Sequence, residues 1–138
     1  MNEMLEGGCL CGAVRYIVTM PIEDIVLCHC THCQKSSGAG ASANSPVPSE
    51  RFELTKGEPK HYADTAESGN TLYRAFCSDC GSSLYSRREK MPERTMLKVG
   101  SLDDSSGSQV IMNIWTRSAR PWSVVDPKLP AHDRNRPT

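Results

Sequence analysis

The 138-residue sequence has few of the large apolar side chains that normally fill a protein core. Leucine, valine, isoleucine and phenylalanine together account for 24 residues, or 17%, which is below the roughly 20% at which a chain tends towards disorder if its net charge is also high. The net charge is zero, with 16 basic and 16 acidic residues, so only half of this disorder signature is present. We therefore expect one folded domain that something besides a large apolar core helps to stabilise.

The sequence also lacks the features of several classes of protein. It has no apolar run near the roughly 18 residues that a membrane span requires. Its first residues include Glu3 and Glu6 where a secretion signal would have a basic segment. The balanced charge, with a pI near 6.9, does not provide the basic surface of a nucleic-acid-binding protein. These absences predict a cytoplasmic protein with neither a membrane nor a nucleic acid as partner.

What the sequence does contain is seven cysteines in three tight groups. The groups are a CxC motif (Cys9, Cys11), a CHCxxC motif (Cys28, Cys30, Cys33) and a CxxCG motif (Cys77, Cys80). An odd number of closely grouped cysteines without a secretion signal favours metal ligation by thiolates over disulfide bonds. Zinc is the default metal, because four thiolates at about 2.3 Å complete a tetrahedral structural site. Seven cysteines then divide into a set of four and a set of three.

The CxxCG motif predicts half of a structural zinc site. Cys77 and Cys80 have the form of a zinc knuckle, in which Gly81 takes a positive φ and turns backbone amides towards the sulfurs. The spacing leaves open whether the CxC pair or part of the CHCxxC group completes this site. The CHCxxC group can also hold one ion from a single loop and leave its fourth position vacant, as a catalytic zinc does. The alternatives for that group are a closed site with His29 or His32 as fourth ligand, and a redox pair.

The remaining pattern predicts a mainly β, single-domain protein. Alternation of apolar and polar residues, or short apolar runs that end at turn residues, predict strands over 12–19, 25–27, 52–54, 72–76, 83–87, 95–102 and 109–116. The segments 72–76 and 83–87 are expected to form a hairpin with the CxxC motif at its tip. Residues 31–37 predict a short helical turn capped by Thr31, followed by a small and polar stretch over 36–49.

These elements place the zinc-binding β domain in residues 1–127. The polar, proline-containing residues 128–138 are predicted to form a loose C-terminal tail.

The segments that contain the cysteines occur in a distinctive order. They are residues 8–16 (GCLCGAVRY), residues 28–38 (CHCTHCQKSSG) and residues 76–85 (FCSDCGSSLY), followed by residues 99–104 (VGSLDD), 114–115 (IW) and 120–122 (RPW). Together they resemble the glutathione-dependent formaldehyde-activating (GFA) enzyme family, which includes centromere protein V. The resemblance runs from about residue 8 to residue 130.

This resemblance implies a β-tent fold of antiparallel sheets, a zinc-stapled single domain. It also implies how the cysteines divide. The ligands of one structural zinc would be Cys9, Cys11, Cys77 and Cys80. The ligands of one catalytic zinc would be Cys28, Cys30 and Cys33. Such a structural ion would supplement a thin core, because zinc binding contributes directly to the folding free energy of small domains.

The family activity is the addition of glutathione to formaldehyde, which in the reverse direction is a carbon-sulfur lyase reaction. A zinc ion with three thiolate ligands offers a fourth position where a substrate thiol can lose its proton and then attack an aldehyde. Lys35 matches a basic position of the family, and we expect it to bind an anionic group of the substrate. The other hypotheses are a non-enzymatic zinc-stapled interaction module and a thiol redox protein.

The sequence departs from the family pattern near the predicted catalytic site. Gln34 stands where many relatives carry arginine, and Asn113 stands where many carry histidine. Residues 39–44 are small where the family usually has bulky side chains. We expect these positions to line the substrate pocket, and they leave the identity of the thiol and of the aldehyde open.

Overall fold

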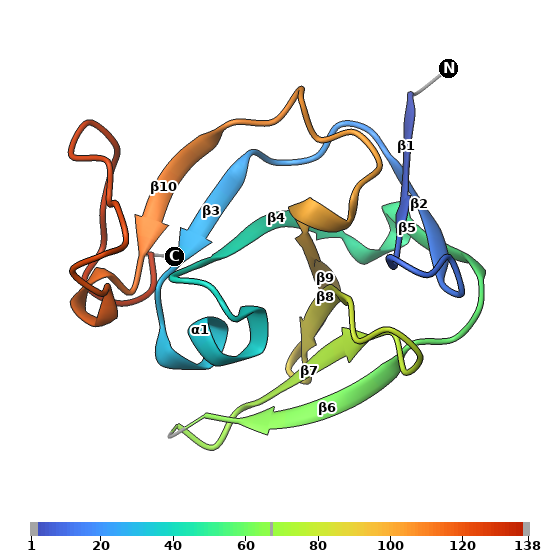
Figure 1. Ribbon diagram of the computed structural model, residues 1–138, viewed down its shortest axis with the longest axis horizontal. Helices are drawn as coiled ribbons and strands as arrows, with labels where there is room; N and C mark the ends of the chain where they lie inside the picture. Colours follow the sequence, from blue (N-terminus) through green and yellow to red (C-terminus); the bar gives the residue numbers. More distant parts are fainter. Residues whose placement is uncertain (1–2, 67, 137–138) are drawn as a thin grey trace.

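The computed structural model describes residues 3–66 and 68–136, which form two β-sheets and a single α-helix (Figure 1). Strands make up 44% of the chain and helices 12%. The mainly β, single-domain fold predicted from the sequence is therefore confirmed. No helix in the described ranges is both long enough and apolar enough to cross a membrane.

The smaller sheet contains three antiparallel strands in the order β1-β2-β5. Their bounds are Met4–Gly8, Arg15–Thr19 and Phe52–Lys56. Within the strand predicted over 12–19, residues 15–19 form β2, and the alternating apolar residues Val14, Tyr16 and Val18 are buried. Gly7 in β1 lies against the Tyr16 ring, where any side chain would overlap it.

The larger sheet contains seven strands in the order β10-β3-β4-β9-β8-β7-β6. In chain order their bounds are Ile25–Cys28 (β3), Ser42–Pro48 (β4), Lys60–Thr65 (β6), Thr71–Phe76 (β7), Ser83–Arg88 (β8), Met91–Lys98 (β9) and Val110–Ile114 (β10). Neighbouring strands are antiparallel except β3 and β10, which are parallel. Figure 1 shows this sheet curving around α1 (Thr31–Ser37), which lies on its inner side.

One apolar core joins the two sheets. The Phe52 ring packs against Tyr16 of the small sheet at a centroid distance of 5.0 Å and against Tyr85 of the large sheet at 4.7 Å. Cys9 and Cys77 are buried members of the same core. These two cysteines also belong to the CxC and CxxCG motifs, which are typical of metal sites. The apolar core therefore extends up to both motifs.

Several predicted elements are confirmed. The hairpin of β7 and β8 carries the CxxC motif at its turn, and Gly81 has the expected positive φ of 78°. The short helix also forms, but its predicted cap is wrong. Cys30 is the N-cap, and its sulfur accepts a hydrogen bond from the Cys33 amide at 3.3 Å, so Thr31 is the first helical residue.

Three strands, β1, β4 and β6, are not evident from the sequence pattern. The β6 strand has no buried face to produce alternation, since nearly all of its residues are exposed. The β4 strand lies inside the large sheet, between β3 and β9, but contains Pro46, Pro48 and small polar residues. Its pairing with β3 and β9 is a tertiary effect, and the buried polar side chains Ser42 and Asn44 have partners there.

The C-terminal segment is held along β10 and is not loose as predicted. The Asn113 amide donates to the Pro130 carbonyl at 3.0 Å, and the His132 amide donates to Asn113 at 2.9 Å. The Trp115 amide donates to the Arg134 carbonyl at 2.9 Å. These bonds occupy an edge that would otherwise be open. The domain boundary at residue 127 stays a prediction.

We predict that Gly57→Ala destabilises the protein more than Gly69→Ala does. Both glycines have a positive φ, of 73° and 86°, which an alanine adopts at a cost of about 1–2 kcal/mol. A side chain at Gly57 would also overlap the Ala13 carbonyl beside β2, whereas Gly69 faces open space. This overlap adds about 1–3 kcal/mol. Urea unfolding of both variants at equal metal content measures the difference, and equal losses would contradict the packing at Gly57.

Candidate functional site

Four cysteines from two distant loops meet at the junction of the sheets. Cys9 and Cys11 lie between β1 and β2, and Cys77 and Cys80 lie in the turn between β7 and β8. All four Sγ atoms lie within 4.8 Å of one another. The structure therefore brings together the set that the family resemblance implies. The other candidate partner of Cys77 and Cys80 is the CHCxxC group. Its three cysteines form a separate cluster.

Backbone and hydroxyl groups surround these four sulfurs. The Val14 amide donates to Cys9 Sγ at 3.2 Å, and the Ser82 hydroxyl lies 3.2 Å from Cys80 Sγ. The Ser82 side chain also accepts from the Leu10 amide at 3.0 Å, which connects the two loops. Hydrogen bonds from Ser82 lower the pKa of the Cys80 thiol to about 5. Donors aimed at sulfur favour the thiolate, which is the form that binds a metal.

The second cluster contains three cysteines from one continuous segment. Cys28 ends β3, Cys30 caps α1, and Cys33 lies in the first turn of that helix. Their Sγ atoms lie within 4.8 Å of one another, and Cys28 and Cys33 are buried. Among the described residues, neither His29 nor His32 belongs to this cluster.

The three thiols of this cluster cannot all ionise unless a cation joins them. Hydrogen bonds from Cys28 and Cys30 lower the pKa of Cys33 to about 2, while hydrogen bonds with Cys30 and Cys33 raise the pKa of Cys28. Three sulfurs so close together share one negative charge, since a second thiolate is repelled by the first.

The donor sets of both clusters fit a thiophilic metal. Each cluster consists of sulfur alone, with no carboxylate among the ligand atoms. Thiolates select ions such as zinc, whereas calcium and magnesium prefer oxygen ligands. The two cysteine clusters can therefore hold metal ions, one with four sulfurs and one with three.

The two histidines of the CHCxxC segment point to other partners. His29 is fully buried, and its Nε2 donates to Asn113 Oδ1 on β10 at 2.8 Å. Asn113, predicted to line the substrate pocket, is buried on β10 and lines neither cavity described below. His32 lies at the surface, with Nδ1 2.8 Å from an oxygen of Asp64.

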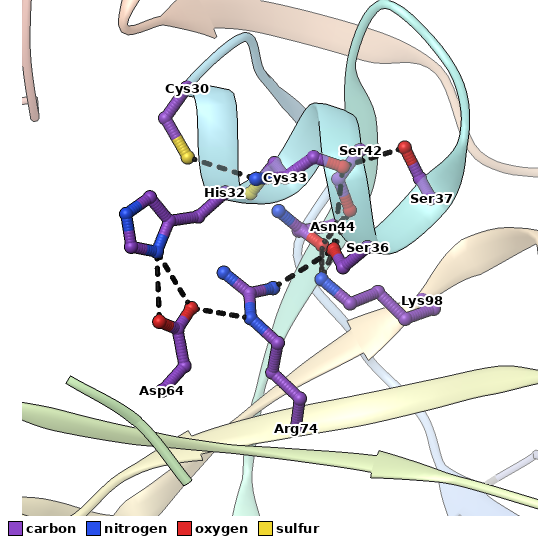
Figure 2. A network of polar contacts seen from close by, with 10 residues as sticks. All are labelled: Cys30, His32, Cys33, Ser36, Ser37, Ser42, Asn44, Asp64, Arg74 and Lys98. Atoms are coloured by element: carbon purple, nitrogen blue, oxygen red, sulfur yellow. Dashed lines mark hydrogen bonds and ion pairs between the residues drawn. The ribbon is translucent and has the colours of Figure 1, made fainter. Parts of the chain in front are cut away.

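Asp64 and Arg74 form a polar network beside the three-cysteine cluster, as Figure 2 shows. Arg74 Nε donates to Asp64 Oδ2 at 2.9 Å, and Arg74 Nη1 donates to Ser36 Oγ at 3.3 Å. Burial by itself raises the pKa of Asp64, but hydrogen bonds from His32 and Arg74 outweigh it and hold this pKa below its usual value. The β6–β7 hairpin thus places the ion pair of Asp64 and Arg74 next to the helix that carries Cys33.

Lys98, at the end of β9, is the second cation near this cluster. Its side chain is buried, with 9% of the residue exposed, and Nζ donates to Asn44 Oδ1 at 2.7 Å and to Ser42 Oγ at 3.0 Å. Burial lowers the pKa of Lys98, and the neighbouring Cys33 opposes that effect.

A cavity of about 650 Å³ lies beside Lys98. Its wall includes Ser36 and Ser37 of α1 and, from the segment predicted to line the substrate pocket, Ala41 and Ala43. Gln34 is not part of the wall, because its amide binds the carbonyls of His29 and Ser118. A further cavity of about 570 Å³, near Pro21 and Met91, contains no cysteine in its wall.

Lys35, the predicted substrate-binding residue, is exposed on α1 and lies outside both cavity walls. Its role stays a prediction. Arg74, Asp64 and Lys98 were not identified from the sequence. In the sequence, the only indication that Lys98 lies near the site is its position directly before residues 99–104, which belong to the family pattern. Nothing in the sequence distinguishes Arg74 and Asp64 from ordinary charged residues of exposed strands.

The chain is similar to one protein family over most of its length. The family model described as "Glutathione-dependent formaldehyde-activating enzyme" matches residues 4–118. A protein of Halomonas elongata with the name "Putative glutathione-dependent formaldehyde-activating enzyme" is 33% identical over 94 residues, which cover 65% of this chain and 60% of that protein. A protein of Sordaria macrospora with the same name is 32% identical over 79 residues, covering 57% of this chain and 32% of that protein.

The matched region thus spans less than two thirds of the length of these curated relatives. A crystal structure of a Rhodobacter sphaeroides protein superposes with a TM-score of 0.59 at 18% identity, covering 92% of this chain and 99% of the other. That likeness supports the fold.

We predict that the reduced protein binds two equivalents of Co²⁺ with sulfur-to-metal charge-transfer absorption. Cys80→Ala and Cys30→Ala should each reduce the number to one, because each removes a ligand from a different cluster. Metal titration followed by ultraviolet absorption gives the stoichiometry, with the free thiols counted first. One equivalent in the unmutated protein would contradict two separate sites.

Proposed function

Because the chain belongs to the glutathione-dependent formaldehyde-activating enzyme family, we propose that it is a zinc enzyme that adds a small thiol such as glutathione to an aldehyde such as formaldehyde. The observation that carries this proposal is the difference between the two clusters, one with four sulfurs and the other with three. Four thiolates close a tetrahedral site, whereas three leave a position for a substrate.

The proposed reaction forms one carbon-sulfur bond. The S–H bond of the thiol breaks, the sulfur electron pair attacks the aldehyde carbon, and the carbonyl π pair moves to oxygen. The oxygen takes up a proton, so the product is a hemithioacetal, which for formaldehyde carries an S-hydroxymethyl group. No oxidant or reductant takes part, and the reverse reaction is that of a carbon-sulfur lyase.

In this proposal, Cys28, Cys30 and Cys33 hold the catalytic zinc. Zinc bound to three thiolates supplies a vacant position at which a thiol loses its proton more readily. The protein holds the three sulfurs in place through the end of β3 and the first turn of α1. Arg74 and Lys98 contribute positive charge beside these sulfurs, which favours the negative charge that develops when a thiol ionises.

Cys9, Cys11, Cys77 and Cys80 have a structural role in this proposal. Their ligand set is complete without a substrate, and it joins the two sheets at the core. Loss of this metal is expected to destabilise the whole domain, because binding of a structural zinc is coupled to folding.

We predict that Cys30→Ala loses the acceleration of S-hydroxymethylglutathione formation, since two sulfurs do not hold the catalytic zinc as three do. Exchange NMR with glutathione and ¹³C-formaldehyde measures the rate, with the uncatalysed rate subtracted. The exposed Ser106→Ala is the control and should keep the full rate.

The thermal midpoint of Cys30→Ala should stay close to that of the unmutated protein if the four-cysteine site is still loaded. A Cys30→Ala protein with full acceleration would refute the proposed site. A fully loaded native protein that gives no acceleration would refute this pair of substrates.

A further inference from the structure

Of the two cations beside the three-cysteine cluster, only one has its charge matched. Arg74 lies 2.9 Å from a carboxylate oxygen of Asp64. Within residues 3–66 and 68–136, Lys98 has no carboxylate partner, and its two hydrogen-bond acceptors, Ser42 and Asn44, are neutral. A buried charge without a counter-charge is strongly unfavourable. An anion near Lys98 would remove this imbalance.

The cysteine sulfurs account for Lys98 only in part. Cys33, Cys28 and Cys30 lie close enough to favour its charged form. The Nζ atom is nevertheless held by two side chains of β4 and makes no hydrogen bond to a sulfur in the described part of the chain. An ammonium group has three N–H donors, so one donor is available for a ligand after Ser42 and Asn44 are counted.

Lys98 also lines the 650 Å³ cavity. The wall includes the hydroxyl side chains of Ser36, Ser37 and Ser42. It also includes Cys9 of the four-cysteine group, and no cysteine of the three-cysteine cluster lines it. The hydroxyl of Ser37 donates to the Cys33 carbonyl at 2.7 Å, so the wall at Ser36 and Ser37 is formed by the helical turn that carries Cys33. The wall also includes the carboxylate of Asp103, which Arg15 neutralises, so among the described residues Lys98 is the one charge of the wall without a counter-charge. Such a buried cation is an environment for a carboxylate on a small polar molecule.

We propose that this cavity binds the carboxylate of a small anionic thiol and that Lys98 is the residue that binds it. This inference rests on the proposed function, since the thiol group of the same molecule is taken to reach the three-cysteine cluster. Lys98 then determines specificity: it selects thiols with a carboxylate over neutral thiols of similar size. Arg74 does not compete for this role, because its Nε already donates to Asp64 and its Nη1 to Ser36.

The test uses a probe without a free thiol, so that binding does not depend on the metal. S-methylglutathione keeps its carboxylates, and its diethyl ester has none. Titration calorimetry on the zinc-loaded protein should show that the acid binds about 10-fold or more tightly than the ester. Lys98→Met should remove this preference, Lys98→Arg should keep part of it, and the exposed Lys90→Met should leave it unchanged.

The inference is overturned if the native protein binds acid and ester equally, a result that needs no variant to fold. It is also overturned if Lys98→Met keeps the native preference, or if Lys35→Met removes the preference in place of Lys98→Met. Loss of the metal of the three-cysteine cluster in Lys98→Met, with the preference intact, would show that the lysine serves the metal site instead.

The rate assay separates this inference from the proposed function. If S-methylglutathione binding depends on Lys98 while glutathione and formaldehyde give no acceleration, the carboxylate site stands and the proposed reaction is wrong. If the reaction is accelerated and Lys98→Met changes neither the acid preference nor KM for glutathione, the reaction stands and the role of Lys98 is refuted.

Discussion

The contact between the Cys9–Cys11 loop and the Cys77–Cys80 turn is the constraint on which the rest of the molecule depends. It joins the small sheet to the large one across 66 positions of sequence between Cys11 and Cys77, whose sulfurs lie 3.8 Å apart. Two of its four cysteines are part of the apolar core. A metal bound there would stabilise a chain with so few large apolar residues, because it would bind the folded state, in which the two loops meet, and not the unfolded chain.

With the two sheets joined, the large sheet curves and encloses α1 (Figure 1). This curvature brings the β6–β7 hairpin and the end of β9 to the helix that carries Cys33. Arg74 with Asp64 arrives from the hairpin, and Lys98 arrives from β9 (Figure 2). The charges of these residues act on the sulfurs at short range in a partly buried setting, where electrostatic effects exceed those in water. The three-cysteine segment is local in sequence, but its environment is assembled from three separate strands.

The sequence predicts most accurately those site features that depend on local backbone geometry. The turn at Cys77–Gly81 requires a glycine with positive φ, and this requirement is visible in the residues themselves. The β4 strand was not evident because its prolines and small polar residues have low strand preference. Its place between β3 and β9, and the hydrogen bonds of Ser42 and Asn44 to Lys98, override that preference. The C-terminal segment was misjudged for the same reason, since its hydrogen bonds to β10 are long-range.

The sequence by itself determined the mainly β class, the family, and the grouping of seven cysteines into motifs suited to metal ligation. Those features depend on composition, on short spacings and on the order of motifs, all of which are local. The tertiary structure showed that the CxC pair meets the CxxC pair, which the spacing had left open and the family resemblance had implied. Only the tertiary structure showed that Lys98 and Arg74 lie near the three-cysteine cluster. The physical reason is that burial and proximity of charges are set by strand order and sheet curvature. A lysine in a strand has the same local pattern whether it faces water or a cluster of thiols.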